Sequence, residues 1–157
     1  MTATLTIAPV RKSIRVKASQ ARAFEVFTSG LSRWWPRNHH ISEQPLKAAV
    51  METRLGGYWY ELSENGERTN VGKITRWEPP TRFVMTWDIN SQWKPDTTVS
   101  SEVEVRFTAE DANTTRVDLE HRKFEQMGVE GGESLRRDVD GGWPGLLEHF
   151  RAEAEAA

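Results

Sequence analysis

Apolar and polar positions alternate near the start of the chain and then change to a helical period. From Val10 to Lys17, apolar residues alternate with charged ones, which predicts a strand. Ser19 follows at an N-cap position, and the apolar residues of 20–28 recur at helical spacing, so a short amphipathic helix is expected there. A second short helical turn is expected over 31–35, before Pro36.

From Ala48 onward the period of the apolar positions changes to two. Six further segments show this alternation and predict strands. The segments are Ala48–Leu55, Gly57–Leu62, Asn70–Trp77, Arg82–Ile89, Ser101–Ala109 and Thr115–Lys123. Asn65 and Gly66 lie between the second and the third of these segments, and both tolerate the positive φ of a type I′ hairpin turn. With the first strand, the pattern predicts an antiparallel sheet of about seven strands.

The helical period returns near the end of the chain. The pair Gly141-Gly142 is expected to break the chain, and Pro144 suits the first turn of the helix that follows. One apolar stripe on this helix is formed by Leu146, Leu147 and Phe150. Because a sheet with one apolar face needs a covering layer, we expect this terminal helix to lie across the sheet, which makes the fold class α+β.

Composition and charge narrow the classes of protein and partner. The chain has 157 residues, so we expect a single domain over residues 1–157. With 21 basic and 23 acidic residues alternating in sign, we expect no nucleic-acid partner. No apolar run reaches the roughly 20 residues that cross a bilayer and no signal peptide is recognisable, so a cytoplasmic location without a membrane span is expected. The absence of cysteine excludes thiolate nucleophiles and zinc-thiolate sites.

Alternation also predicts which side chains face the core. Val117, Leu119 and His121 share one face of their strand, opposite Arg116 and Glu120, so His121 is expected to point inward. A second one-sided apolar row contains Phe83, Met85, Trp87 and Ile89. In the segment 57–62, the alternation places Tyr58, Tyr60 and Leu62 on one face and Trp59 and Glu61 on the other.

Six short motifs occur in one order from Ile14 to Phe150. They are Trp34-Trp35, Gly56 to Trp59, Gly72 to Pro80, Phe83 to Trp87, Thr115 to His121, and Gly142-Trp143. In this order they resemble the Hsp-90 ATPase activator homologue (AHSA-type) branch of the START-like, or SRPBCC, superfamily. The resemblance implies a helix-grip fold: a curved antiparallel sheet wrapped on a long C-terminal helix, with two short helices between the first two strands.

The resemblance also implies an internal pocket that binds a small hydrophobic or amphipathic molecule, and this is the function we expect. The expected lining residues are Trp34, Trp35, Tyr58, Tyr60, Met85, Trp87, His121, Trp143 and Leu147. The segment from Phe124 to Asp140 is a candidate mobile lid over this pocket. The alternative is a core without a pocket, because 7 tryptophans and 6 phenylalanines are enough to fill the space between sheet and helix.

Further polar residues are candidates for the rim of this pocket. His39 and His40 lie in a loop that should border its mouth, and Glu52 and Arg54 share one strand face that could meet a polar ligand group. Adjacent histidines do not form a metal site by themselves, so neither a metal nor a cofactor is expected.

Two other functions remain as alternatives to binding. A polyketide cyclase or lyase of this superfamily needs a shaped pocket and one general acid or base, for which His121, Tyr58 and Tyr60 are the candidates. The sequence has no nucleophile elbow, P-loop or dinucleotide fingerprint, so no residue is assigned as catalytic. The third alternative is an interaction protein. The activators that give the branch its name carry a further N-terminal domain, for which 157 residues leave no room, so we do not expect a chaperone partner; a homodimer remains open.

Overall fold

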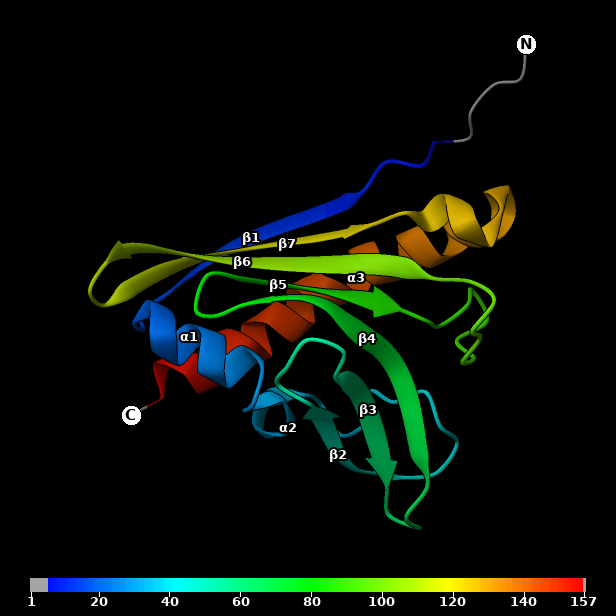
Figure 1. Cartoon of the computed structure of the whole chain (residues 1–157), viewed down its shortest axis with the longest axis horizontal. Helices are drawn as coiled ribbons and strands as arrows, with labels where there is room; N and C mark the ends of the chain where they lie inside the picture. The colour runs from blue at the N-terminus through cyan, green and yellow to red at the C-terminus, as the bar shows by residue number, and fades with distance from the viewer. Residues whose placement is uncertain (1–5, 157) are drawn as a thin grey trace.

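The computed structural model of the protein describes residues 6–156, in which seven antiparallel strands form one curled sheet with a long helix against it (Figure 1). The strands are β1 (Val10–Val16), β2 (Leu46–Met51), β3 (Tyr58–Ser63), β4 (Arg68–Glu78), β5 (Arg82–Trp87), β6 (Ser101–Asp111) and β7 (Thr114–Arg122). The helices are α1 (Gln20–Phe27), α2 (Leu31–Trp34), η1 (Phe124–Met127) and α3 (Val129–Glu155). This is the expected helix-grip α+β fold.

The order of the strands in the sheet is β1-β7-β6-β5-β4-β3-β2. The first strand therefore lies beside the last one, with Val10 opposite His121 and Val16 opposite Thr115. Because β1 and β2 form the two edges, α1 and α2 must carry the chain from one edge of the sheet to the other. Both helices contact α3 on the way, so the three helices form one layer against the sheet.

Side chains of α1 fix the far end of α3. Ser19 caps α1 by accepting a hydrogen bond from the backbone N–H of Arg22, at 3.2 Å. Arg22 in turn donates to the carbonyl oxygens of Ala154 and Ala156, each at 2.8 Å. Ala154 is in the last turn of α3 and Ala156 follows it. The carbonyl oxygens at the end of a helix have no hydrogen-bond partners within the helix itself. The guanidinium of Arg22 therefore supplies the cap of α3 from a distant part of the chain.

Helix α3 differs from the expectation, because it is continuous from Val129 to Glu155 and includes Gly141, Gly142 and Pro144. Glycine costs about 1 kcal/mol and proline about 3 kcal/mol inside a helix. One buried stripe offsets these costs along the whole helix and contains Leu135, Val139, Trp143, Leu146, Leu147, Phe150 and Ala154. The segment proposed as a lid is thus regular structure: η1 and the first half of α3. In residues 6–156, no helix is both long and apolar enough to cross a membrane.

The hairpin between β3 and β4 also differs from its prediction. A type I′ turn needs positive φ at both central residues, but only Gly66 has it, with φ of 89°, and Asn65 does not. Gly66 donates its N–H to the carbonyl of Ser63 at 2.9 Å, and the N–H of Ser63 reaches the carbonyl of Glu67 at 2.8 Å. This pattern is a three-residue loop with glycine in the left-handed position, the commonest alternative to a two-residue hairpin.

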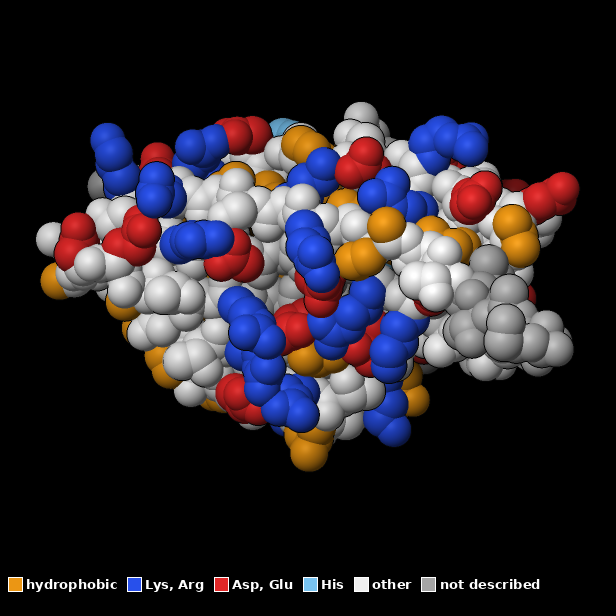
Figure 2. Space-filling view, turned by 90° about the horizontal axis from the view of Figure 1, so that it is seen from above, with side chains coloured by type: hydrophobic (Ala, Val, Ile, Leu, Met, Phe, Trp, Pro, Cys, Tyr) orange, Lys and Arg blue, Asp and Glu red, His pale blue; other side chains and the backbone are white. Residues whose placement is uncertain are grey.

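The surface seen from above in Figure 2 carries interleaved basic and acidic side chains. On the outer face of the sheet, Glu104 of β6 accepts hydrogen bonds from Arg82 at 3.1 Å, from Arg106 at 2.7 Å and from Arg122 at 2.5 Å. Burial raises the pKa of Glu104, but the hydrogen bonds from Arg122, Arg106 and Arg82 outweigh it and bring the pKa to about 2. Glu104 is therefore a buried charge that the surrounding arginines neutralise.

The sheet bends along β4, which pairs with β3 through its first half and with β5 through its second half. Gly72 lies at this change of partner, and a Cβ there would stand 1.7 Å from the carbonyl oxygen of Thr86. The approach is held by two hydrogen bonds: Lys73 N–H to Thr86 Oγ1 at 2.9 Å, and Asp88 N–H to the carbonyl of Val71 at 2.7 Å. Only glycine permits this close approach between two strands.

We predict that Gly72→Ala lowers the free energy of unfolding by about 3 kcal/mol or more, because its methyl group would push the backbones of β4 and β5 apart. Gly141→Ala is the matched control, since a Cβ at Gly141 meets no atom within 4 Å. Alanine there should raise the free energy of unfolding by about 0.5–1 kcal/mol by favouring the continuous helix. Urea unfolding followed by circular dichroism measures both; a Gly72→Ala protein as stable as the wild type would contradict the account of the bend.

Candidate functional site

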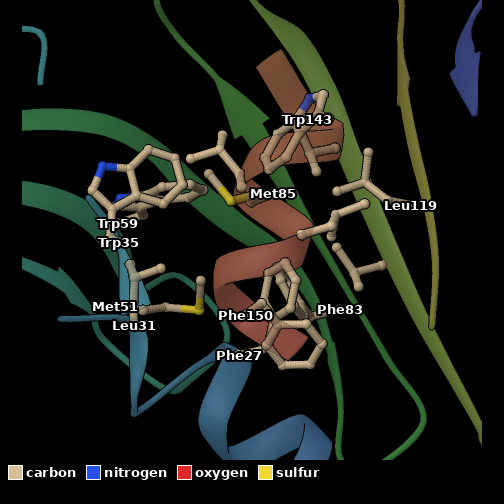
Figure 3. Packing of buried hydrophobic residues seen from close by; sticks show 14 of the residues in the cluster. Phe27, Leu31, Trp35, Met51, Trp59, Phe83, Met85, Leu119, Trp143 and Phe150 are labelled. Atoms are coloured by element: carbon tan, nitrogen blue, oxygen red, sulfur yellow. The ribbon is translucent and has the colours of Figure 1, made fainter. Parts of the chain in front are cut away.

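Aromatic rings fill the centre of the space between the sheet and α3. Phe27 of α1 lies 4.9 Å from Phe150 and 5.8 Å from Phe107, measured between ring centroids. Figure 3 shows Phe27, Phe83 and Phe150 gathered beside α3, with Trp35 and Trp59 apart from them. At this place the filled core that the sequence left open as an alternative is present, and any pocket between sheet and helix must lie elsewhere along α3.

Two cavities remain at the end of the molecule where β2, β3 and the first half of β4 bend away. The larger has a volume of ≈ 230 Å³ and is lined by Trp35, Asn38, His39, His40, Ile41, Trp59, Glu61, Val71, Trp87 and Trp93. The smaller has ≈ 70 Å³ and reaches α3, with a lining of His39, Trp87, Trp93, Asp138, Val139, Gly142, Trp143 and Leu146. Because they share His39, Trp87 and Trp93, we treat them as one site, the tryptophan cleft.

Four indole rings form the walls of the larger cavity. Neighbouring rings stand nearly perpendicular: Trp35 to Trp59 at 4.9 Å and 89°, Trp59 to Trp87 at 5.6 Å and 85°, and Trp87 to Trp93 at 6.5 Å and 86°. Edge-to-face contacts of this kind hold each ring in place. The indole N–H of Trp87 is buried without a hydrogen-bond partner among the described residues. The cleft therefore combines rigid aromatic walls with one unsatisfied donor.

Glu61 of β3 supplies a buried carboxylate to the cleft, with only 3% of the residue exposed. Its oxygens accept the backbone N–H groups of Ile41 at 2.7 Å and Ser42 at 3.2 Å, which fastens the loop between α2 and β2 to the sheet. Burial raises the pKa of Glu61 above its usual value, and the hydrogen bonds from Ile41 and Ser42 and the charge of His40 oppose that rise.

The same loop brings His39 and His40 to the cleft, as expected from their place in the sequence. The carbonyl of His39 accepts the indole N–H of Trp35 at 2.7 Å, and the ring of His40 contacts the carbonyl of Ser42 through Nδ1 at 2.5 Å. Burial, followed by the neighbouring His40, lowers the pKa of His39. Within residues 6–156, no three histidine or acidic side chains gather as a metal site.

Six of the nine expected lining residues have other places in the structure. Trp34, Met85 and Leu147 are buried in the filled core, where Trp34 donates its indole N–H to the carbonyl of Val26 at 2.9 Å. Of the nine expected residues, only Trp35, Trp87 and Trp143 line the cleft. The remaining three are Tyr58, Tyr60 and His121.

Tyr58 and Tyr60 lie on the outer face of the sheet, under the guanidinium of Arg68, whose carbon is 5.8 Å from the Tyr58 ring and 3.8 Å from the Tyr60 ring. The inner face of β3 carries Trp59 and Glu61 instead. Alternation separated the two faces correctly, but because both bear aromatic rings it did not show which face points inward. Glu52 accepts the N–H of Tyr58 at 2.9 Å and, like the exposed Arg54, lines neither cavity.

His121 points inward as expected, but it is fully buried and lines neither cavity. Its Nδ1 accepts the indole N–H of Trp143 at 3.2 Å, so the ring proton sits on Nε2, which donates to Ser101 Oγ at 2.8 Å. Burial lowers the pKa of His121 to about 3. With both nitrogens satisfied away from the cleft, this histidine is a structural group and not a general acid or base for a ligand.

Among the lining residues that sequence reasoning missed are Trp59, Glu61 and Trp93. Trp59 and Glu61 alternate with the tyrosines, so choosing the other face of β3 would have found them. Trp93 lies in the loop after β5, where no period exists to orient a side chain. It has a positive φ of 61°, and its indole N–H donates to Asp138 Oδ2 of α3 at 3.1 Å. Only the folded chain shows that this loop reaches the helix.

The chain is similar to proteins of known family and structure. A family model described as "Activator of Hsp90 ATPase homolog 1-like protein" matches residues 17–155. The anthrahydroquino-gamma-pyrone synthase Txn09, complexed with SUM, is 37% identical, with 94% of this chain and 97% of Txn09 covered and a TM-score of 0.66. The self-sacrificing resistance protein CalC from Micromonospora echinospora is 33% identical, with 93% of each chain covered and a TM-score of 0.68. No curated protein matches the chain.

We predict that protonation of His121 destabilises the fold, because a charged ring would direct a second N–H at the indole donor of Trp143. Since burial brings the pKa of His121 to about 3 from the ordinary 6.5, its contribution to stability is complete above pH 6.5 and is lost as the pH falls below that value. Between pH 7 and pH 5, the wild type should lose about 2 kcal/mol more than His121→Gln.

Urea unfolding at several pH values measures this difference. The exposed His149 offers the control, because His149→Gln should follow the wild-type pH dependence. Parallel pH curves for the wild type and His121→Gln would show that His121 is not held neutral in the fold.

Proposed function

The chain belongs to the Activator of Hsp90 ATPase homolog 1-like family, and on that premise we propose that it binds a small aromatic molecule in the tryptophan cleft. The observation that carries this proposal is the set of four indoles around one cavity, each nearly perpendicular to the next. Ligand sites are typically concave, mostly apolar and equipped with a few fixed polar groups, which describes this cleft. The relatives support the same function, because Txn09 is complexed with SUM and is 37% identical to this chain.

The size of the cleft limits the ligand. The two cavities together hold about 300 Å³, which is at the lower end of the range for small-molecule sites. A ligand of one or two fused rings suits this volume, and a larger ligand would require Trp93 to move, since that residue lines both cavities. Trp93 is half-buried, packs edge-to-face against Trp87 and donates one hydrogen bond to Asp138 of α3, so a ligand that displaced it would have to break these contacts.

The polar groups of the cleft indicate where a ligand makes hydrogen bonds. The N–H of Trp87 has no partner among the described residues and is shielded from solvent, so a ligand oxygen reaches it only if the surrounding rings shift; leaving such a buried donor unsatisfied costs about 1–3 kcal/mol. Glu61 can accept a hydrogen bond from a ligand hydroxyl or amine, because each carboxylate oxygen has more than one lone pair. An aromatic ring with a hydroxyl substituent therefore matches both the walls and the carboxylate of Glu61.

We predict that Val71→Phe weakens ligand binding at least about 10-fold, which corresponds to about 1.4 kcal/mol. Val71 is a buried core residue that also lies on the wall of the larger cavity, so the added ring would take ligand volume, and circular dichroism of Val71→Phe checks that the fold survives. Val129→Phe is the control for the same change of residue, because Val129 is 53% exposed and lines neither cavity.

Flavonoids, polyketide-like aromatics and lipids are titrated while tryptophan fluorescence and melting temperature are followed. The wild type and Val129→Phe should respond to the same compounds, and Val71→Phe should respond weakly. A wild type without response to any of these compounds would count against the proposed function, and an unchanged affinity in Val71→Phe would place the ligand elsewhere.

Catalysis of a ring closure in the same cleft is the second candidate function. Two titratable groups line the larger cavity with pKa values displaced toward each other: burial raises that of Glu61 and lowers that of His39. Such a pair suits general acid-base chemistry near neutral pH. The 37% identical Txn09 is a pyrone synthase, which favours a substrate with a phenol and a conjugated ketone. In such a ring closure on a phenol enone, the phenol oxygen bonds to the β-carbon of the alkene, the double bond becomes a single bond, and the phenol proton moves to the α-carbon, which gives a dihydropyrone with two more hydrogens than a γ-pyrone.

The catalytic proposal predicts a product of unchanged mass when polyketide-like phenol enones are incubated with the protein. Glu61→Gln should lower the rate at least about 100-fold if the carboxylate moves the proton, whereas His149→Gln should have no effect. Chromatography with mass detection measures the product. Equal rates for Glu61→Gln and the wild type would remove the carboxylate from the reaction.

A further inference from the structure

The tryptophan cleft differs in charge from the other hollows of the molecule. Its lining includes the carboxylates of Glu61 and Asp138 and neither lysine nor arginine. The other described hollows mix acidic residues with basic ones: Arg11, Lys12, Arg106 and Arg116 with Glu104, Asp118 and Glu120 in one, Arg68 and Lys73 with Asp88 and Asp96 in a second, and Arg82 and Arg106 with Glu78 in a third. Since 21 lysines and arginines are spread over the chain, a site without them stands out.

Both carboxylates are fixed in position without an ion-pair partner among residues 6–156. Glu61 is held by the backbone N–H groups of Ile41 and Ser42. Asp138 is held by the indole N–H of Trp93, at 3.1 Å from Oδ2. The cleft thus has a carboxylate at each end, one on β3 and one on α3, with the indole rings between them.

Indole faces attract cations more strongly than other aromatic faces do, and several of them around one volume form the aromatic cage that binds quaternary ammonium groups. Trp35, Trp59, Trp87 and Trp93 surround the larger cavity at nearly right angles to their neighbours. An anionic ligand would meet the two carboxylates without a basic partner. His39 and His40 are the only other titratable groups in the linings of these two cavities, and they carry a positive charge only when protonated.

We propose that the ligand of the tryptophan cleft carries an organic ammonium group, which the indole faces and the carboxylates of Glu61 and Asp138 recognise. This inference rests on the proposed binding function and adds the charge of the ligand to it. The ammonium group lies against the rings of Trp87 and Trp93, which line both cavities, between Glu61 of the larger cavity and Asp138 of the smaller one.

Two probes of the same shape separate charge from hydrophobicity. In 3-hydroxyphenyltrimethylammonium a positively charged nitrogen stands where 3-tert-butylphenol has a neutral carbon, and both carry the same phenol group. Binding is measured by calorimetry, and its location by the indole N–H resonances of the 7 tryptophans in ¹⁵N NMR spectra. The ammonium probe should bind at least about 10-fold tighter than the phenol, and only its affinity should fall with added salt.

Asp138→Asn tests the carboxylate on α3, because the amide oxygen of asparagine can still accept the N–H of Trp93. This change should weaken the ammonium probe about 3-fold to 10-fold and leave 3-tert-butylphenol unchanged. Asp140→Asn is the matched control: Asp140 lies on the same helix, pairs with Lys12 at 2.8 Å and lines neither cavity. Glu61→Gln should have the same effect as Asp138→Asn, with the wild-type pattern of indole resonances as the check on the loop.

The outcomes separate this inference from the proposed function. If 3-tert-butylphenol binds in the cleft as tightly as the ammonium probe, the site is a neutral aromatic pocket, and the charge inference is wrong while the proposed function stands. If neither probe shifts the indole resonances of the cleft, both are wrong for this class of ligand. Equal effects of Asp138→Asn and Asp140→Asn would also overturn the role given to Asp138.

Discussion

The close contact between β4 and β5 at Gly72 determines the shape of the whole sheet. Where the backbone at Gly72 meets the carbonyl of Thr86, β4 changes partner, and β2 and β3 turn away from the plane of the other strands (Figure 1). The straight part of the sheet lies against α3 closely enough for aromatic rings to fill the space. The turned part does not, and the loops before β2 and after β5 close it only partly. The filled core and the tryptophan cleft thus both follow from one bend.

The cleft is rigid because each of its groups is held by another. Trp35 is held by the carbonyl of His39, Trp93 by Asp138, and Glu61 by two backbone N–H groups. A site whose groups are already ordered loses little conformational entropy when a ligand binds, so more of the contact energy appears as affinity. The exception is the N–H of Trp87, which the protein leaves without a partner among the described residues.

The order of elements and the fold class could be predicted from the sequence, because hydrophobic period and the Ser19 cap are local signals. Predictions from local sequence patterns were wrong where long-range packing determines the structure. Gly141, Gly142 and Pro144 disfavour a helix, yet the buried stripe on both sides of them keeps α3 continuous. In β3, tyrosines and a tryptophan occupy opposite faces, and the choice between them depends on which ring meets Trp35 and Trp87. Trp93 and Asp138 meet across 45 residues of sequence, a distance that no local pattern spans.

The pairing of β1 with β7 has a consequence for how the chain is made. Val10 pairs with His121, so the first strand has no neighbour in the sheet until more than 100 later residues have left the ribosome. At about 5–20 residues per second, synthesis leaves that strand unpaired for roughly 5–20 s. During this time its charged positions, such as Arg11 and Arg15, discourage pairing with the edge strands of other nascent chains. The alternating charges of β1 therefore protect the protein during translation, before they take their places on its surface.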